Sequence, residues 1–203
     1  MKRFNLQSLI LLLSVIFSLL MTSCNQKKEA KVTLRANPDS AAQKAINNPA
    51  FIENPNGENF CWQARGAMGQ FVNNYELTGD PKWLDAGIKY YDFITSKLII
   101  DPDGYKGWIG EYGYDSRYFQ DALVGDAILM AGLLDFAILV KENDQLNAKY
   151  GAKADEYIGY AKKDFIEKWD KRGCWIDDAP FGGYIGFNKY LKADNLKEWI
   201  YGP

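Results

Sequence analysis

The 203-residue chain contains no histidine, and this absence excludes several kinds of site. Without histidine there is no Ser-His-Asp triad, no histidine-ligated zinc and no histidine general base. Basic residues are not in excess either, because 24 lysines and arginines stand against 26 aspartates and glutamates. Proteins that bind the phosphate backbone of nucleic acids normally carry such an excess. We therefore expect no nucleic-acid partner.

The N-terminus has the pattern of a secretory signal. Two basic residues, Lys2 and Arg3, precede an apolar run at 9–21, and small residues follow the run. The run is shorter than the roughly 18 to 20 apolar residues that a spanning helix needs. The letters "MTSC" that end at Cys24 resemble the bacterial lipobox, with methionine in place of the usual leucine. This resemblance implies cleavage before Cys24, lipidation of its thiol, and a lipid anchor at the bacterial cell envelope, on the outer membrane or facing the periplasm.

The rest of the chain is predicted to consist of a tether and a domain. Residues 24–50 are polar and poor in large apolar side chains, as expected of a segment that holds a domain off a membrane. We therefore expect a signal peptide at 1–23, a tether at 24–50 and an ordered domain at 51–203 that begins near Phe51. A domain of this length can bury a sizeable hydrophobic core.

Cysteine is scarce, and only Cys61 and Cys174 remain after the lipidation that we expect. In an exported chain a disulfide between them is permitted, and closing so long a loop would stabilise the fold by roughly 4 to 5 kcal/mol in the chain-entropy model. Their positions in the sequence are equally compatible with two separately buried thiols. Both interpretations stay open at this point.

Four segments of the domain have the apolar periodicity of helices. The third is apolar nearly all round, which is typical of a helix buried between other elements, whereas the fourth is polar on one side. Gly79 ends the first segment, and Asp80 and Pro81 are a typical start for the second, so these two form a helical hairpin. The order along the chain is inner, outer, inner, outer. The four predicted helices cover residues 62–77, 81–98, 121–143 and 152–169.

Long connections rich in glycine, aromatic residues and acids follow the two outer helices. Connections of this length are uncommon in compact helical domains unless they have a function. Sugar rings have flat apolar faces and rims of hydroxyl groups, so their sites combine aromatic platforms with carboxylates, amides and arginines. Both connections offer such groups. They are Trp108, Glu111, Tyr112, Tyr114, Asp115, Arg117 and Tyr118 in the first, and Trp175, Asp177, Asp178 and Tyr184 in the second.

Two sequence stretches resemble a known superfamily. "YELTGDPKWLDAGIKYYDFI" at 75–94 and "YFQDALVGDAILMAGLLDFA" at 118–137 are similar to the six-hairpin glycosidase-like (α/α) toroids, which include unsaturated glucuronyl hydrolases and several polysaccharide lyases. The resemblance covers about residues 60–175. It implies an all-α fold of alternating inner and outer helical hairpins, with the active site where outer-to-inner connections meet. A complete toroid needs many more helices than the four predicted, so we expect a partial toroid.

Asp121 stands where the third predicted helix begins. The usual role of such an aspartate is to cap the helix N-terminus, which is worth about 1 kcal/mol. The resemblance implies another role, because an aspartate that opens an inner helix protonates the substrate in glucuronyl hydrolases, and Asp121-Ala122-Leu123 is similar to that setting. A general acid requires a raised pKa, which burial beside aromatic rings would give. A lyase would instead need a base, and in a chain without histidine that base would be a tyrosine such as Tyr114 or Tyr118.

Other acidic residues are expected to be structural. Asp126 lies inside the third predicted helix and would need a partner such as Arg65. Asp101 and Asp103 in "DPDG" suggest calcium, but the later ligands of a calcium loop are missing, so we predict a turn. We expect neither a metal nor a cofactor.

The predicted function is that of an envelope-anchored, carbohydrate-active protein, most simply a glycoside hydrolase acting on an oligosaccharide or polysaccharide. Arg65 and Arg117 would suit the carboxylate of a uronic acid through their fork geometry. The alternatives are a polysaccharide lyase, a non-catalytic, glycan-binding helical-repeat lipoprotein, and a structural helical-repeat protein with no ligand. Every carbohydrate-related interpretation requires the segments around Trp62, Tyr114 and Trp175 to converge on one hollow. With Asp121 and Tyr114 as catalytic candidates, the predicted substrate-binding residues are Trp62, Arg65, Trp108, Tyr112, Asp115, Arg117, Tyr118, Trp175 and Asp178.

Overall fold

A computed structural model describes most of the predicted domain and a short segment before it. All described residues lie in one compact unit, Thr33–Pro203. The predicted signal peptide, Cys24, Phe51 and Tyr114 lie outside them. The described residues are 36–48, 57–101, 103–112, 115, 117–178, 180–184, 187–191 and 199–202.

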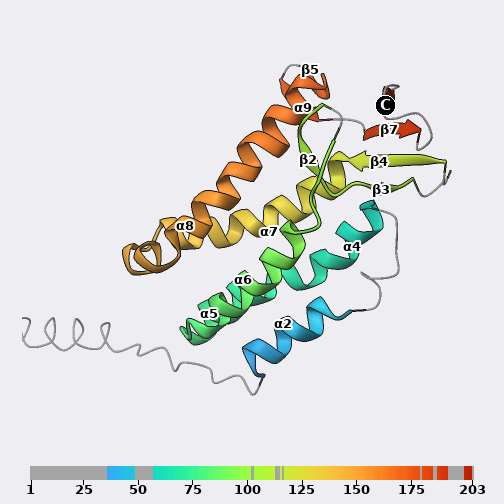
Figure 1. The fold of residues 1–203 in the computed structure, drawn as a ribbon. Helices are drawn as coiled ribbons and strands as arrows, with labels where there is room; N and C mark the ends of the chain where they lie inside the picture. The colour runs from blue at the N-terminus through green and yellow to red at the C-terminus, as the bar shows by residue number, and fades with distance from the viewer. Residues whose placement is uncertain are drawn as a thin grey trace, which may run out of the picture. The chain divides into compact units, whose positions relative to one another are not determined.

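The described chain is mostly helical, which confirms the coarse fold class (Figure 1). The last three helical elements follow one another without a break, so that η1, a segment of π-helix, is enclosed between two α-helices. The helices are α2 (Pro38–Ile46), α4 (Gly57–Met68), α5 (Gln70–Thr78), α6 (Lys82–Thr95), α7 (Leu123–Lys141), α8 (Asp144–Tyr160), η1 (Ala161–Glu167) and α9 (Lys168–Lys171).

The two long connections contain short strands that the all-α prediction did not include. Strands β3, β4, β7 and β8 form an antiparallel sheet in that order, and β1–β2 and β5–β6 are separate two-stranded pairs. In the sheet, Asp121 of β4 is the register partner of Asn188 in β7. The strands are β1 (Ile99–Ile100), β2 (Lys106–Gly107), β3 (Gly110–Glu111), β4 (Tyr118–Ala122), β5 (Trp175–Asp178), β6 (Phe181–Tyr184), β7 (Phe187–Leu191) and β8 (Trp199–Gly202).

Helix boundaries follow the local signals in the sequence, with two differences. The first predicted helix is divided into α4 and α5 at Gly69, and it ends at Gly79, whose positive φ of 65° suits a residue without Cβ. The last long helix begins eight residues earlier than predicted, at Asp144. There the side chain of Asn143 caps it by accepting a hydrogen bond from the backbone N–H of Leu146 at 3.1 Å.

The core lies where α7 packs against α4 and α8. Gly132 of α7 lies against Met68 of α4, and an added Cβ would approach that residue's own Cβ to 2.6 Å, so glycine permits this close helix contact. Buried rings from α6 and α8 surround Phe136 of α7, and Tyr91 meets Tyr157 edge-on at 6.0 Å. The hydroxyl of Tyr91 donates to the Met68 carbonyl at 2.8 Å, so its one polar group is satisfied.

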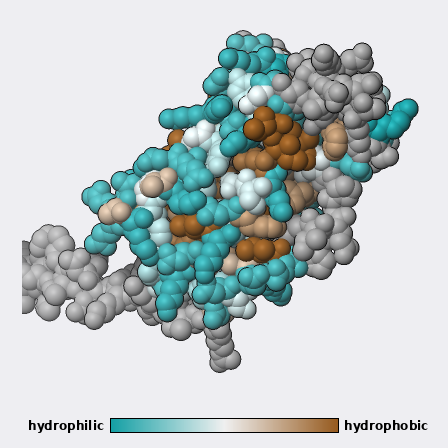
Figure 2. All heavy atoms as spheres, viewed as in Figure 1, coloured by the Kyte–Doolittle hydropathy of each residue, from teal (hydrophilic) through white to brown (hydrophobic). Residues whose placement is uncertain are grey.

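Helix α7 is long and apolar enough to cross a membrane, but half of its most apolar stretch is buried inside the protein. A core helix of a soluble protein has the same length and composition. On the face shown in Figure 2, hydrophobic residues form separate patches with hydrophilic residues between them.

The expected tether contains a packed helix. Helix α2 lies against α6, and its Ala42 is buried in the core. Asn37 caps this helix through a hydrogen bond to the backbone N–H of Ser40, and Pro38 occupies its first turn. The prediction that ordered structure begins near Phe51 was therefore wrong, because the small apolar residues of α2 are enough to pack against a neighbouring helix.

Candidate functional site

Six charged residues meet in the interior and form what we call the buried ion cluster. They come from four different elements, the connection after α6, strand β4, helix α7 and helix α9. Three carboxylates and both cations of the cluster are buried. The cluster consists of Asp101, Asp103, Asp121, Asp126, Lys168 and Arg172.

Lys168 uses all three of its ammonium hydrogens inside this cluster. It donates to Oδ2 of Asp121 at 2.9 Å, to Oδ2 of Asp126 at 2.5 Å and to the carbonyl oxygen of Lys106 at 2.9 Å. Burial lowers the pKa of Lys168, but the charges of Asp126 and Asp121 outweigh this effect and raise it. Lys168 is therefore a charged residue in the interior of the protein.

Arg172 holds three carboxylates with one guanidinium group. Its Nη1 donates to Asp121 Oδ2 at 2.7 Å and its Nε to Asp103 Oδ2 at 2.8 Å, while its Nη2 donates to Asp101 Oδ2. The guanidinium carbon also lies 4.7 Å from the centroid of the Trp169 ring. The planar fork of arginine suits such a site, because one side chain can meet several carboxylates at once.

The helical spacing at the end of the chain explains why both cations reach the cluster. Lys168 and Arg172 are four residues apart, so they lie on the same face of α9 and its C-terminal end. The π-helical segment η1 directly before them has wider turns than an α-helix, which changes the direction in which the following residues face. From its sequence this segment was predicted to be a polar outer helix, without buried cations.

Asp121 has a different position and charge from those expected. It lies in β4, and the N-cap residue of α7 is Ala122, which forms no side-chain cap. Burial acts to raise the pKa of Asp121, but the charges of Lys168 and Arg172 hold it below its usual value. The expected raised pKa was wrong, and in this ion-paired state the carboxylate holds no proton to donate at neutral pH.

Two other carboxyl groups of the cluster have raised pKa values. Burial and the charge of Asp121 raise the pKa of Asp101 to about 8 and that of Asp126 to about 7. Asp126 accepts hydrogen bonds from Lys168 and from Nε1 of Trp169, and not from the expected partner Arg65. Asp126 thus has the hydrogen-bond partners that a buried carboxylate needs, but they belong to α9, far along the chain.

The two cysteines are both buried and free, which favours the interpretation as separate thiols. Cys61 of α4 lies close to the buried ion cluster, and burial together with the charge of Asp126 raises its pKa well above the usual value. It is thus a neutral thiol, and Gly125 of α7 packs directly against its sulfur.

Trp108 and the residues around Arg117 differ in exposure. Trp108 is buried, and its Nε1 donates to the carbonyl oxygen of Ile94 at 2.8 Å, so it is part of the core and presents no face for stacking. Arg117 forms a two-bond ion pair with Asp115 and lies 5.8 Å from the ring centroid of Tyr118. Tyr112 is half-buried near this pair. Asp115, Arg117 and Tyr118 thus interact with one another at the surface. Tyr114 lies outside the described residues.

Trp62 and Arg65 form a local pair on the exposed face of α4. The Arg65 guanidinium lies 5.6 Å from the centroid of the Trp62 ring, and Nε1 of Trp62 donates to Glu58 at 3.3 Å. The residues that line the pocket at Trp175 do not include Trp62. Because Tyr114 is not among the described residues, the convergence of the three expected segments stays a prediction.

The β5–β6 pair holds an exposed aromatic site. Trp175 and Tyr184 are register partners, and their rings meet edge-on with centroids 4.9 Å apart. The Tyr184 hydroxyl donates to Oδ1 of Asp170 at 2.5 Å, and these three residues line an open pocket of about 480 Å³. Phe181 at the start of β6 is 79% exposed. We call Asp170, Trp175 and Tyr184 the aromatic hairpin site. The side chain of Asp178, in the same hairpin, lies outside the described residues.

Glycine shapes this site. The indole of Trp175 lies against Gly182, and a Cβ added there would come within 2.4 Å of the ring. The next residue, Gly183, has nothing within 4 Å of an added Cβ. Sequence reasoning included Trp175 and Tyr184 among the aromatics of this connection but missed Asp170. The usable signal was the Gly182-Gly183 pair, which marks a place where a large ring can approach the backbone.

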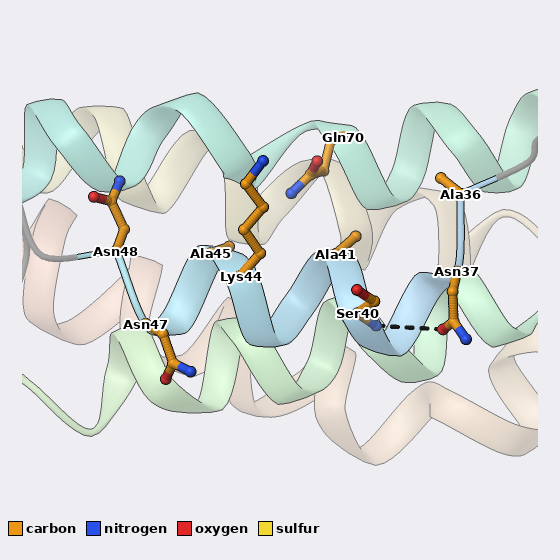
Figure 3. A pocket seen from close by; sticks show the side chains of 9 residues that line it. All are labelled: Ala36, Asn37, Ser40, Ala41, Lys44, Ala45, Asn47, Asn48 and Gln70. Atoms are coloured by element: carbon orange, nitrogen blue, oxygen red, sulfur yellow. Dashed lines mark hydrogen bonds between the residues drawn. The ribbon is translucent and has the colours of Figure 1, made fainter.

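A larger pocket, of about 780 Å³, lies along α2 and involves none of the predicted site residues (Figure 3). Its lining is made of short or flexible side chains, with Lys44 and Gln70 beside alanines and asparagines. Its described lining residues include no aromatic platform and no carboxylate. The aromatic hairpin site is therefore the better candidate for a ligand.

The described residues contain no group of three or more histidine, cysteine or acidic side chains arranged to hold a metal ion. Comparison of the whole chain with family models, curated proteins and solved structures gave no match.

Proposed function

We propose that this protein binds carbohydrate through the aromatic hairpin site. The observation that carries the proposal is an exposed indole, that of Trp175, whose centroid lies 4.9 Å from that of Tyr184 in a pocket that Asp170 also lines. Trp175 is 47% exposed although it could pack in the core, as Trp108 and Trp169 do. A held but exposed aromatic ring is what stacking on a sugar face requires.

The polar groups beside the indole favour a neutral sugar. Asp170 accepts from Tyr184, and its second oxygen can accept from a sugar hydroxyl. Burial and Asp170 raise the pKa of Tyr184 to about 12, so its hydroxyl keeps its proton and can also accept a hydrogen bond. The exposed Asp177 adds a further negative charge to the hairpin. A uronate carboxyl would be repelled here, so the proposed ligand class is a neutral oligosaccharide.

Binding without catalysis agrees best with the geometry. Asp121, the predicted general acid, is buried and paired with Lys168 and Arg172. A hydrolase would therefore need another acid, and a lyase would depend on Tyr114 or Tyr118.

The partial toroid also belongs to the proposal. In it α4 and α7, which pack against each other, are the inner helices, and α6 and α8, joined by the ion pair of Asp92 and Lys153, are the outer helices. Lipidation at Cys24 and an envelope location complete it.

Replacing Trp175 by alanine is expected to weaken oligosaccharide binding at least tenfold. An aromatic contact of this kind is worth about 1.5 kcal/mol beyond its buried area, which corresponds to about tenfold in Kd. Titration calorimetry of the full-length chain would measure this, with cello-, manno- and xylo-oligosaccharides as neutral probes and oligogalacturonate as the acidic one. Equal binding by the Trp175→Ala variant and the native chain would reject the site, and tighter binding of oligogalacturonate would reject the ligand class.

Gly182→Ala should weaken binding of the same probe while Gly183→Ala leaves it unchanged. The added methyl at 182 would meet the indole at 2.4 Å and displace it, whereas the methyl at 183 has free space. Both variants add one Cβ to the same strand, so their shared effects on strand stability cancel. The intrinsic tryptophan fluorescence and the Kd of each variant are the measurements. An effect of equal size in both would mean that the position of the indole does not matter.

A further inference from the structure

The buried ion cluster has an unbalanced charge. Asp101, Asp121 and Asp126 are buried, as are Lys168 and Arg172, so three carboxylates face two cations and one negative charge is left over. Asp103, whose side chain is 26% exposed, can be compensated partly by solvent and is not counted. An uncompensated charge in the interior is costly, and a buried acid usually takes up a proton before it remains unpaired.

Two oxygen atoms in the same place have no hydrogen-bond donor. Asp101 Oδ1 and Asp121 Oδ1 are buried and unpartnered among the described residues. The other oxygens of these two carboxyl groups are bound by neighbouring nitrogens of Arg172, Nη2 and Nη1 respectively. Because Nη1 and Nη2 belong to one guanidinium, the two carboxyl groups lie beside each other. A hydrogen bond between them, which contributes to the raised pKa of Asp101, requires a proton on one of them.

We propose that Asp101 and Asp121 share one proton and act as a proton-binding site buried in the fold. The proton is taken from solvent when the chain folds, forms an O–H bond on Oδ1 of Asp101 and is donated to Oδ1 of Asp121. This single proton satisfies both unpartnered oxygens and balances the charge of the buried groups. Asp121 remains ionised, as its bonds to Lys168 and Arg172 require.

Asp101 is a better proton carrier than Asp126. Asp126 Oδ2 already accepts from Lys168 and from Trp169, so the ionised form is the one its surroundings bind. The raised pKa of Asp101, about 8, agrees with a proton that is kept at neutral pH. The charged and titratable groups that face the site are Glu58 and Cys61 from α4, Asp101 and Asp103 from the connection, Asp121 from β4, Asp126 from α7, Asp164 from η1, and Lys168 and Arg172 from α9.

The direction of the pH effect follows from where the proton is bound. Asp101 has an ordinary pKa of 3.8 when unfolded and about 8 when folded, so between these values the folded chain carries one more proton. Its contribution to stability is fully present below the unfolded pKa and is lost as the pH rises through about 8. Asp126, whose pKa is raised by burial and by the charge of Asp121, competes for the same proton and adds no second one, because one proton already balances the buried charge. Unfolding in this window therefore releases protons.

Asp101→Asn is the direct test. The asparagine amide can donate to Asp121 Oδ1 in place of the proton, and its carbonyl can accept from Arg172. Urea unfolding of the full-length chain between pH 5.5 and 9 should show about one proton fewer released on unfolding than in the native chain. An unchanged pH slope in the folded variant would overturn the proposal. Asp103→Asn, which removes a partly exposed acid of the same cluster, is the matched control and should keep the native slope.

Infrared difference spectroscopy provides a second measurement that identifies the carrier. The native chain at pH 6.5 should show the C=O stretch of a protonated carboxyl, and the band should disappear above pH 9. The band should persist in Asp126→Asn and be lost in Asp101→Asn. Loss of the band in Asp126→Asn alone would place the proton on Asp126 and overturn the proposal. If Asp101→Asn fails to fold, the Asp126→Asn spectrum still decides between the two carriers.

Discussion

Replacing Lys168 by alanine should lower the free energy of unfolding by about 3 to 5 kcal/mol, the cost of removing one partner from a buried ion pair. The ammonium group is fully buried and binds Asp121, Asp126 and the Lys106 carbonyl. Its loss leaves two carboxyl groups with fewer donors in a site that water does not reach. Urea unfolding followed by circular dichroism would measure the change.

Lys171→Ala is the matched control for this prediction. Lys171 lies in the same short helix, but its side chain is 68% exposed and its ion pair is with Glu167, one turn before it. Exposed pairs of this kind contribute little, so the unfolding free energy should stay close to the native value. If both alanine variants lost similar amounts of stability, the effect would lie in the helix and not in the buried ion cluster.

Gly57→Ala should also destabilise the fold strongly, by about 3 kcal/mol, near the upper end of the range for overpacking. An added Cβ would lie 2.1 Å from the Trp108 carbonyl oxygen and 2.6 Å from the Gly110 nitrogen. These are backbone atoms, which cannot rotate away, so α4 and strand β3 would have to separate. The midpoint of urea unfolding and the near-ultraviolet signal of Trp108 are suitable measurements.

The same substitution on the same helix provides the comparison. Gly66 has nothing within 4 Å of an added Cβ, and Gly66→Ala should stabilise α4 by about 0.5 to 1 kcal/mol because alanine is the better helix former. The two variants are thus expected to change stability in opposite directions. A similar loss at both positions would contradict the close approach of α4 to the segment at Trp108.

The helices could be predicted because their signals are local. The apolar pattern gave α7 to within two residues at each end, and Gly79 and Pro81 marked the turn between α5 and α6. Two further local signals are present, a break at Gly69 and an N-cap at Asn143. The prediction relied on apolar periodicity alone, so it merged α4 and α5 into one helix and began the last long helix too late. For the four predicted helical segments, the helical type was thus more secure than the exact ends.

The site could not be predicted to the same extent because it depends on distant pairings. Asp121 looked like a helix cap, and only its pairing with a strand some 67 positions later, at Asn188, makes it part of a sheet. Lys168 and Arg172 fall in a segment rich in charged residues, where nothing local distinguishes a buried cation from an exposed one. The exposure of Trp175 and the burial of Trp108 were undecided for the same reason.

The short π-helix η1 makes the length of the chain before α9 as important as its composition. Each α-helical residue turns the chain by about 100°. The hydrogen bonds of a π-helical segment such as η1 span five residues instead of four, so each of its turns holds about one residue more. The loss of a single codon from residues 161–167 would let this segment relax to an ordinary helix. Because the wider segment holds one residue more for nearly the same rotation, Lys168 and Arg172 would then keep almost the same direction. The loss of a codon from the regular helix α8 would instead turn every later side chain by about 100°, and both cations would point away from their carboxylates although no residue that touches them had changed.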